Sequence, residues 1–167
     1  MENSLKITGA PSLEELHKSP AYPDKDRLYK GPVAIIECIE EIPCNPCEAA
    51  CPNKAITIGE SITNLPVMDL EKCVACGLCI PACPGLAIYI KDYTYSDTKA
   101  LLSFPYEYYP LPEVNDIVEA VDRHGNILCE AKVIRVRNPK TNDHTAVVTI
   151  EYPKEYFEEV VSIKRIK

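Results

Sequence analysis

Residues 73–84 read Cys73-Val74-Ala75-Cys76-Gly77-Leu78-Cys79-Ile80-Pro81-Ala82-Cys83-Pro84, a C-x₂-C-x₂-C-x₃-C-P run. The first three thiols follow one another closely, so one tight loop can bring them to a single centre. Gly77 lets the backbone approach that centre with unusual dihedral angles. Pro84 enforces a turn after the fourth cysteine, so we expect Cys83 to face a different centre from the one that the first three thiols approach. The run predicts a metal-cluster site.

An internal repeat with an offset of 32 residues relates this run to an earlier one. Residues 51–58 read Cys-Pro-Asn-Lys-Ala-Ile-Thr-Ile, and residues 83–90 read Cys-Pro-Gly-Leu-Ala-Ile-Tyr-Ile. The same offset places Cys44 on Cys76 and Cys47 on Cys79. The repeat predicts two halves related by a local pseudo-twofold axis.

With these motifs, residues 31–92 resemble the bacterial-type ferredoxin domain that carries two [4Fe–4S] clusters. In that family the fourth cysteine of each run ligates the other cluster. The resemblance implies two ligand sets, namely Cys38, Cys44, Cys47 and Cys83 for cluster I, and Cys73, Cys76, Cys79 and Cys51 for cluster II.

The two halves differ at one ligand position. The repeat calls for a cysteine at position 41, but Glu41 stands there and the nearest cysteine is Cys38. The first spacing is therefore C-x₅-C, and a loop lengthened by three residues can still return a thiolate to the same corner. We expect Cys38 to be the ligand; the alternatives are a [3Fe–4S] cluster or a carboxylate ligand from Glu41.

A second resemblance is carried by residues 37–52, ECIEEIPCNPCEAACP, with the complete run downstream and a β-rich C-terminal region. Together they look like the ferredoxin-like small subunit of multi-subunit FAD-dependent amino- and imino-acid dehydrogenases, of the proline, hydroxyproline and sarcosine type. This resemblance implies a hetero-oligomer with FAD-containing dehydrogenase subunits.

The expected fold is α+β, with four consecutive regions. Residues 1–30 form an N-terminal extension, in which Ser12 and Glu15 fit a capping box for a short helix. Residues 31–92 form the dicluster domain and begin with a strand at 33–36. Residues 93–112 are a linker rich in Tyr and Pro. Residues 113–167 form a small antiparallel β domain, a meander or open barrel, with strands expected at 116–121, 127–137, 145–152 and 160–166.

Composition excludes several classes of function. The 167 residues carry 18 Lys and Arg against 25 Asp and Glu, a net charge of −7, which argues against nucleic acid and anionic membrane surfaces. Neither a membrane-spanning apolar run nor the apolar core of a secretory signal is present, and cluster assembly suits a reducing interior, so we expect the cytoplasm, in an anaerobe.

The remaining chemistry-bearing residues have plain interpretations. Cys129 lies in a predicted strand, where a thiol packs as a small apolar residue. His17, His124 and His144 are scattered over the extension and turns and are expected at the surface. Structural zinc is disfavoured because zinc knuckles are usually separated, and disulfides because the cysteines are concentrated in one segment. Glu37, Glu40, Glu41 and Glu48 either lower the potential of cluster I or form a solvated face.

Clusters held by four thiolates have no open iron site, and the sequence contains no catalytic triad or nucleotide-binding loop. We therefore predict an electron-transfer protein that is not itself an enzyme. Three hypotheses follow: a non-catalytic subunit relaying single electrons between flavin sites of a dehydrogenase complex, a free-standing soluble ferredoxin serving several redox partners, or a structural iron–sulfur module.

Overall fold

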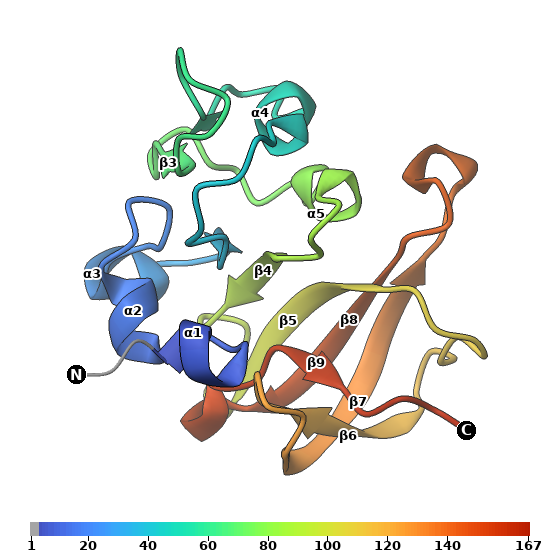
Figure 1. The fold of residues 1–167 in the computed structure, drawn as a ribbon. Coiled ribbons are helices and arrows are strands. Elements are labelled where there is room, and N and C mark those ends of the chain that lie inside the picture. Colours follow the sequence, from blue (N-terminus) through green and yellow to red (C-terminus); the bar gives the residue numbers. More distant parts are fainter. Residues whose placement is uncertain (1–3) are drawn as a thin grey trace.

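A computed structural model describes residues 4–167 and shows mostly antiparallel strands with a few short helices (Figure 1). The helices are α1 (Ser4–Thr8), α2 (Leu13–His17), α3 (Lys25–Leu28), α4 (Pro46–Ala50) and α5 (Cys79–Ala82), with 3₁₀ turns η1 (Lys140–Asn142) and η2 (Lys154–Tyr156). The strands are β1 (Val33–Ile36), β2 (Ile56–Thr57), β3 (Val67–Met68), β4 (Ile88–Asp92), β5 (Lys99–Tyr106), β6 (Ile117–Val121), β7 (Ile127–Arg137), β8 (Ala146–Pro153) and β9 (Ser162–Ile163).

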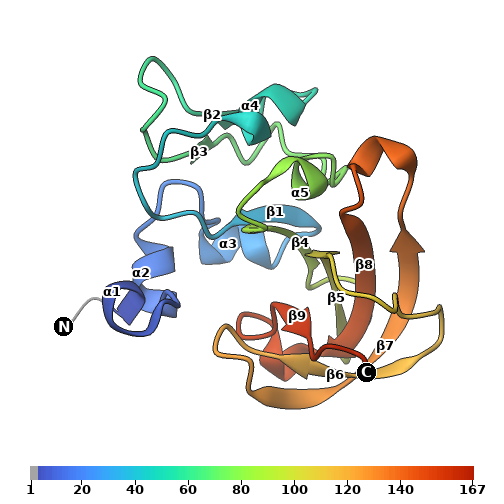
Figure 2. The same ribbon diagram turned by 45° about the vertical axis from the view of Figure 1, so that its right-hand side comes forward.

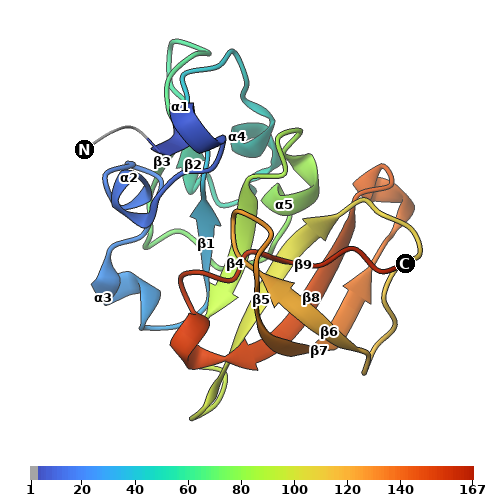
Figure 3. The same ribbon diagram turned by 60° about the horizontal axis from the view of Figure 1, so that its bottom comes forward.

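One continuous antiparallel sheet joins the cysteine-rich segment to the C-terminal region. Its strand order is β1-β4-β5-β8-β7-β6-β9, and β2 pairs with β3 in a separate small ribbon. β5 is the strand that connects the two parts, because it pairs with β4 on one side and with β8 along its whole length on the other. Figure 3 shows β4, β5, β8 and β7 side by side.

The cysteine-rich segment packs against one face of β1 and β4. All four residues of β1 are buried, with Ala34 and Ile36 on this face and Val33 and Ile35 on the other. The second face contributes to a larger core that also receives Leu16 of α2 and side chains of β5 to β8. Strand β1 therefore separates the two cores, and Figure 2 shows α4, β2 and β3 stacked on its outer side.

Most local expectations are confirmed. The Ser12 capping box forms, with the Glu15 N–H donating to Ser12 Oγ at 3.2 Å and the Ser12 N–H donating to Glu15 Oε2 at 2.7 Å. β1, β6, β7 and β8 occupy the predicted strand segments. The last predicted strand shortens to β9, which pairs with β6 at the far edge of the sheet.

The segment expected as a linker needs correction, because residues 99–106 form β5 in the interior of the sheet. Pro105 lies within this strand, although proline cannot donate to a ladder. The structure accommodates it because β4 pairs with β5 only from Leu101 to Ser103. Beyond that point β5 has a neighbour on one side only, the side of β8.

Candidate iron–sulfur site

The eight clustered cysteines divide between two small cavities. Ordered by sequence, Cys38, Cys44, Cys47 and Cys83 line the first, and Cys51, Cys73, Cys76 and Cys79 line the second. Each cavity thus takes three cysteines from one half of the repeat and one from the other half. These are the same two sets that the ferredoxin resemblance implies.

Each cavity has an aliphatic floor made by one cross-strand pair of β1 and β4. Ile36 pairs with Ile88 under the first cavity, and Ala34 pairs with Ile90 under the second. The two pairs are two residues apart along β1, which corresponds to about 7 Å. The two thiol sets are therefore adjacent and separated from the larger core by a single strand pair.

The turns that place the crossing cysteines are alike in the two halves. Cys51 ends α4 and Cys83 ends α5, both with extended backbone angles. Three residues later, Lys54 and Leu86 have φ values of 51° and 53°. The N–H groups of the following alanines point at the cysteines: Ala55 donates to Cys51 Sγ at 3.2 Å, and Ala87 to Cys83 Sγ at 3.5 Å. Such bonds stabilise thiolate charge, so each turn both orients its cysteine and would support it as a thiolate.

The loops that carry the other cysteines of the two cavities differ between the halves. In the second half, Ala75 and Gly77 have φ values of 53° and 77°, which curls the chain around the second cavity. The repeat offset places Pro43 and Asn45 at these positions, and Asn45 has a φ of −143°. The first loop therefore follows a different path. It brings Cys38 to the cavity, whereas Glu41 is exposed and is not among the residues that line it.

Burial raises the pKa of several of these thiols. It raises the pKa of Cys38, of Cys47 to about 11 and of Cys79 to about 12. Neighbouring thiols raise the same pKa values further, Cys83 for the first two and Cys76 for Cys79. A coordinating metal deprotonates a thiol outright, so the positive charge of iron would compensate what burial costs.

Among residues 4–167, no three His, Cys, Asp or Glu side chains are grouped so as to hold a single metal ion. A cubane differs from a single ion because each of its four irons takes one thiolate at a separate corner. Two sets of four cysteines around two cavities have the donor chemistry that such clusters require.

Sequence reasoning missed a buried ionic network beside the first cavity. Arg123, in the turn between β6 and β7, donates through Nε to Glu37 Oε2 at 2.8 Å and through Nη2 to the Glu158 carbonyl at 3.0 Å. Lys91 on β4 is fully buried and donates to the carbonyls of Phe157 and Glu158 at 2.7 and 3.1 Å. Glu37 is therefore paired rather than part of a solvated acidic face. No local pattern distinguishes these residues from ordinary surface charges.

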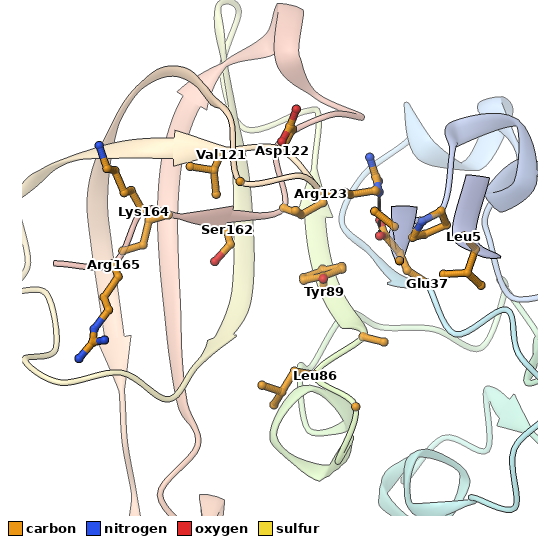
Figure 4. A pocket seen from close by; sticks show the side chains of 18 of the residues that line it. Leu5, Glu37, Leu86, Tyr89, Val121, Asp122, Arg123, Ser162, Lys164 and Arg165 are labelled. Carbon is orange, nitrogen blue, oxygen red and sulfur yellow. Dashed lines mark hydrogen bonds and ion pairs between the residues drawn. The ribbon is translucent and has the colours of Figure 1, made fainter. Parts of the chain in front are cut away.

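Arg123 and Glu37 also line a cavity of about 750 Å³ (Figure 4). Figure 4 shows their side chains directed at one another beside Tyr89. Leu86, in the turn after Cys83, lines the same cavity. The network therefore joins the first cysteine set to the C-terminal strands.

Residues 37–87 match the family of 4Fe–4S dicluster domains. The chain thus contains a ferredoxin-type domain that carries two [4Fe–4S] clusters. Both cysteine quartets lie within the matched segment, and the match covers just under a third of the chain. No solved structure matches the chain with comparable significance.

Curated relatives share this domain. An uncharacterized ferredoxin of Methanocaldococcus jannaschii is 47% identical over 47 residues, 28% of this chain and 29% of the relative. The polyferredoxin-like subunit of an aliphatic sulfonate oxidoreductase of Pyrococcus furiosus is 37% identical over 82 residues, 44% of this chain and 43% of the relative. A subunit of the ion-translocating oxidoreductase complex of Methanosarcina acetivorans is 35% identical over 82 residues, 49% and 28% of the two chains.

The chain spans less than half the length of each of these relatives. The dicluster domain, together with the two relatives named as oxidoreductase subunits, supports an iron–sulfur electron-transfer role. Within residues 4–167, no helix is long and apolar enough to cross a membrane.

Proposed function

We propose that this chain is a non-catalytic electron-transfer subunit that relays single electrons between flavin sites of an FAD-dependent amino- or imino-acid dehydrogenase complex. The observation that carries the electron-transfer role is the division of eight cysteines between two adjacent cavities. We propose Cys38, Cys44, Cys47 and Cys83 as the ligands of cluster I, and Cys51, Cys73, Cys76 and Cys79 as those of cluster II.

The surroundings of the thiols suit electron transfer better than substrate chemistry. Four thiolates occupy all four corners of a cubane and leave no iron free for a substrate. Apolar side chains line much of the rest of each cavity, among them Ile58 in the first and Ile56 and Met68 in the second, beside Glu40 and Asn64 in the first and Asn53 and Lys72 in the second. Such walls limit access of water, which is one of the features that set a cluster's potential. The clusters supply one-electron chemistry, and the chain holds and insulates them.

The role as a subunit is supported by the relatives and by the fold. Two of the relatives are named as subunits of oxidoreductases. The dicluster domain here is built into a sheet that continues for five further strands, through β5, β8, β7, β6 and β9. A small diffusing carrier needs no such extension, whereas a subunit can use it as a contact surface. The flavin partners are proposed from the resemblance of residues 37–52 to dehydrogenase small subunits.

Anaerobic purification of the tagged protein at native expression tests the proposed complex. We expect flavin-containing polypeptides to copurify in a fixed ratio, and their FAD to be reduced by an amino or imino acid. Electrons should then reach the clusters, seen as bleaching of their visible absorbance. Isolation of the chain alone, with clusters that dithionite reduces, would favour the free-standing ferredoxin. Clusters that no donor can reduce would indicate a structural module.

The ligand assignment of cluster I is tested separately with Cys38→Ser and Glu41→Gln. We expect Cys38→Ser to lose iron and to change one of the two [4Fe–4S] signals in electron paramagnetic resonance. Glu41→Gln should leave both signals as they are, because Glu41 lies outside the cavity. Two unchanged signals in Cys38→Ser, with a change in Glu41→Gln, would reverse the assignment.

A further inference from the structure

Two arginines without partners lie beside the loop of the proposed cluster II. The side chains of Arg135 and Arg137 on β7 take part in no hydrogen bond or ion pair within residues 4–167, although their backbones pair with β8. Both line a groove whose other wall is formed by Ala75, Cys76 and Gly77. In a chain with a net charge of −7, a pair of free cations at this place calls for a specific explanation.

A β-bulge is what aims these arginines at the groove. The register of β7 with β8 shifts between Val133 and Arg135, so that Val133 pairs with Ile150 but Arg135 pairs with Thr149. Without the shift, Arg135 would share the face of Val133, which is fully buried in the larger core. Bulges commonly re-aim side chains next to functional sites. Here the bulge turns Arg135 and Arg137 to the face that carries the cysteine-rich segment.

Strand pairing within the sheet connects the arginines to the second cysteine cavity. Thr149 pairs with Ser103 on β5, and their hydroxyls are hydrogen-bonded at 2.8 Å on the floor of the groove. Ser103 pairs with Ile90, which also lines the second cavity. A single row of the sheet thus runs from Arg135 to the floor of the cluster II site. Figure 2 shows α5, which follows the cysteine loop, beside β8.

The proposed cluster II is also the more accessible of the two at this point. Cys76 is exposed, whereas the other eight cysteines are half-buried or buried. Two apolar side chains of the same loop are exposed as well, Val74 at 65% and Leu78 at 47%. Exposed apolar residues at a site rimmed by charge are typical of a contact surface.

We propose that this groove docks an acidic surface of the protein that exchanges electrons with cluster II, with carboxylates facing Arg135 and Arg137 and apolar contacts on Val74 and Leu78. The proposal rests on the proposed electron-transfer function. The groove holds about 170 Å³, which is below the roughly 300–1,000 Å³ of pockets that enclose a whole small molecule. It therefore fits side chains of a docked protein. Asp92 also lines the groove, but its Oδ1 accepts hydrogen bonds from Thr94.

The step that docking serves is the transfer of one electron. A reduced cluster held by Cys51, Cys73, Cys76 and Cys79 would supply one electron, and a one-electron acceptor in the docked protein, a flavin being the class proposed above, would gain it. No bond forms or breaks in this step. The reverse transfer, from a donor to the oxidised cluster, balances in the same way.

Anaerobic stopped-flow oxidation of the full-length, cluster-loaded protein tests the proposal with two small oxidants. Each oxidant accepts one electron. Fe(III)–EDTA is an anion and is attracted by the arginines. Hexaammineruthenium(III) is a cation, so it reports on oxidation of the cluster without that attraction. The test variant is Arg135→Gln/Arg137→Gln. The matched control is Lys99→Gln/Lys154→Gln, which removes the same charge near the opposite end of β5. Lys99 lies four residues, or about 13 Å, from Ser103 in the row of Arg135, and six residues, or about 20 Å, from Pro105 in the row of Arg137. A glutamate-only peptide serves as the acidic competitor.

At low salt we expect the test variant to slow oxidation by Fe(III)–EDTA about fivefold, and the control to change it less than about twofold, since nearby charges steer anionic partners. Oxidation by hexaammineruthenium(III) should not slow. The peptide should inhibit Fe(III)–EDTA oxidation of the unaltered protein but not of the test variant, and high salt should remove the differences.

Equal slowing in the test and control variants would overturn the docking site, because it would show an effect of net charge alone. Equal inhibition of both by the peptide would overturn the acidic partner. Cluster content and dithionite reduction are measured first for every variant. Clusters that dithionite cannot reduce in the unaltered protein would refute the proposed function and this proposal with it. Reducible clusters without the charge effects would refute the docking site alone.

Discussion

Replacement of Arg123 by Met should destabilise the protein strongly, because it breaks a buried ion pair between distant parts of the chain. Glu37 directly precedes Cys38, and Arg123 lies in the turn between β6 and β7. Their side chains are 9% exposed for Arg123 and 6% for Glu37, and two Arg123 nitrogens contact the Glu37 carboxylate. Burial lowers the pKa of Arg123, but the hydrogen bond and the charge of Glu37 act against burial and the pKa is raised overall, so Arg123 stays charged. Methionine has a similar length but leaves the Glu37 carboxylate without a counter-charge.

The magnitude follows from what an unpaired buried charge costs. Removing one partner of a buried pair typically costs about 3–5 kcal/mol, whereas an exposed pair contributes about 1 kcal/mol or less. The chain offers a matched control in Lys164 and Glu119, whose contact is 3.1 Å and whose side chains are 53% and 50% exposed. Lys164→Met should therefore lower the free energy of unfolding by no more than about 1 kcal/mol.

Anaerobic urea unfolding, followed by circular dichroism and by the visible absorbance of the clusters, measures both variants. Removal of both buried charges in Glu37→Leu/Arg123→Met should cost less than Arg123→Met alone, because apolar replacement of a whole buried pair is often nearly neutral. A loss in Arg123→Met no larger than that in Lys164→Met would refute the assignment of the buried pair as a structural link. If the double variant lost as much free energy of unfolding as the single variants Glu37→Leu and Arg123→Met together, the electrostatic explanation would be refuted.

Three further changes test other features of the structure. Burial, followed by the charge of Arg123, lowers the pKa of Lys91 from 10.5 to about 7. The unfolded chain then binds more protons between those values, so the free energy of unfolding should rise with pH from about 7 to about 10. Urea midpoints of Lys91→Met should lack that rise. If the midpoints of the variant and of the unaltered protein changed with pH in parallel, the lowered pKa of Lys91 would be contradicted. Lys54→Gly should stabilise the protein against urea by up to about 1 kcal/mol, because exposed Lys54 has a φ of 51° and glycine takes such angles freely; Lys30→Gly, outside the left-handed region, should destabilise it. Cys129→Ala should keep the iron content unchanged, because Cys129 lines neither cysteine cavity; a loss of iron would give the ninth cysteine a role in cluster binding.

The donor chemistry of the site could be predicted from the sequence because it is local. The cysteines follow one another at fixed short spacings, and a loop of a few residues has little freedom in where it can bring them. The same reasoning led to the prediction that Cys38 replaces the ligand missing at position 41, since a missing residue in an otherwise regular repeat is visible in the sequence; the structure places Cys38 at the first cavity, and its role as a ligand stays a prediction. The spacing did not reveal that Lys54, Ala75 and Leu86 take left-handed angles, because none of them is glycine.

The continuity of the sheet could not be predicted because it depends on pairings between distant residues. Ala100 pairs with Tyr152, and Ser103 with Thr149, across more than 45 residues of sequence. Pro105 and the tyrosines around it gave this stretch the composition of a linker. The burial of Lys91 was equally hidden, since its partners are the main-chain carbonyls of Phe157 and Glu158, which carry no sequence signal.

One mark in the sequence does anticipate the groove at Cys76. Alternation along β7 breaks where two apolar residues, Val133 and Ile134, stand together, and the charged positions then continue at Arg135 and Arg137. A regular strand would send Arg135 into the core with Val133, where an unpaired guanidinium would cost far more than any contact it made. The break in alternation therefore requires a bulge, and the bulge in turn puts both arginines on the face of β5 and β4. β4 also contributes to the floor of both cysteine cavities. Strand β7 is distant from the cysteines in sequence, but through β8 and β5 it places the charges of Arg135 and Arg137 beside the second cavity.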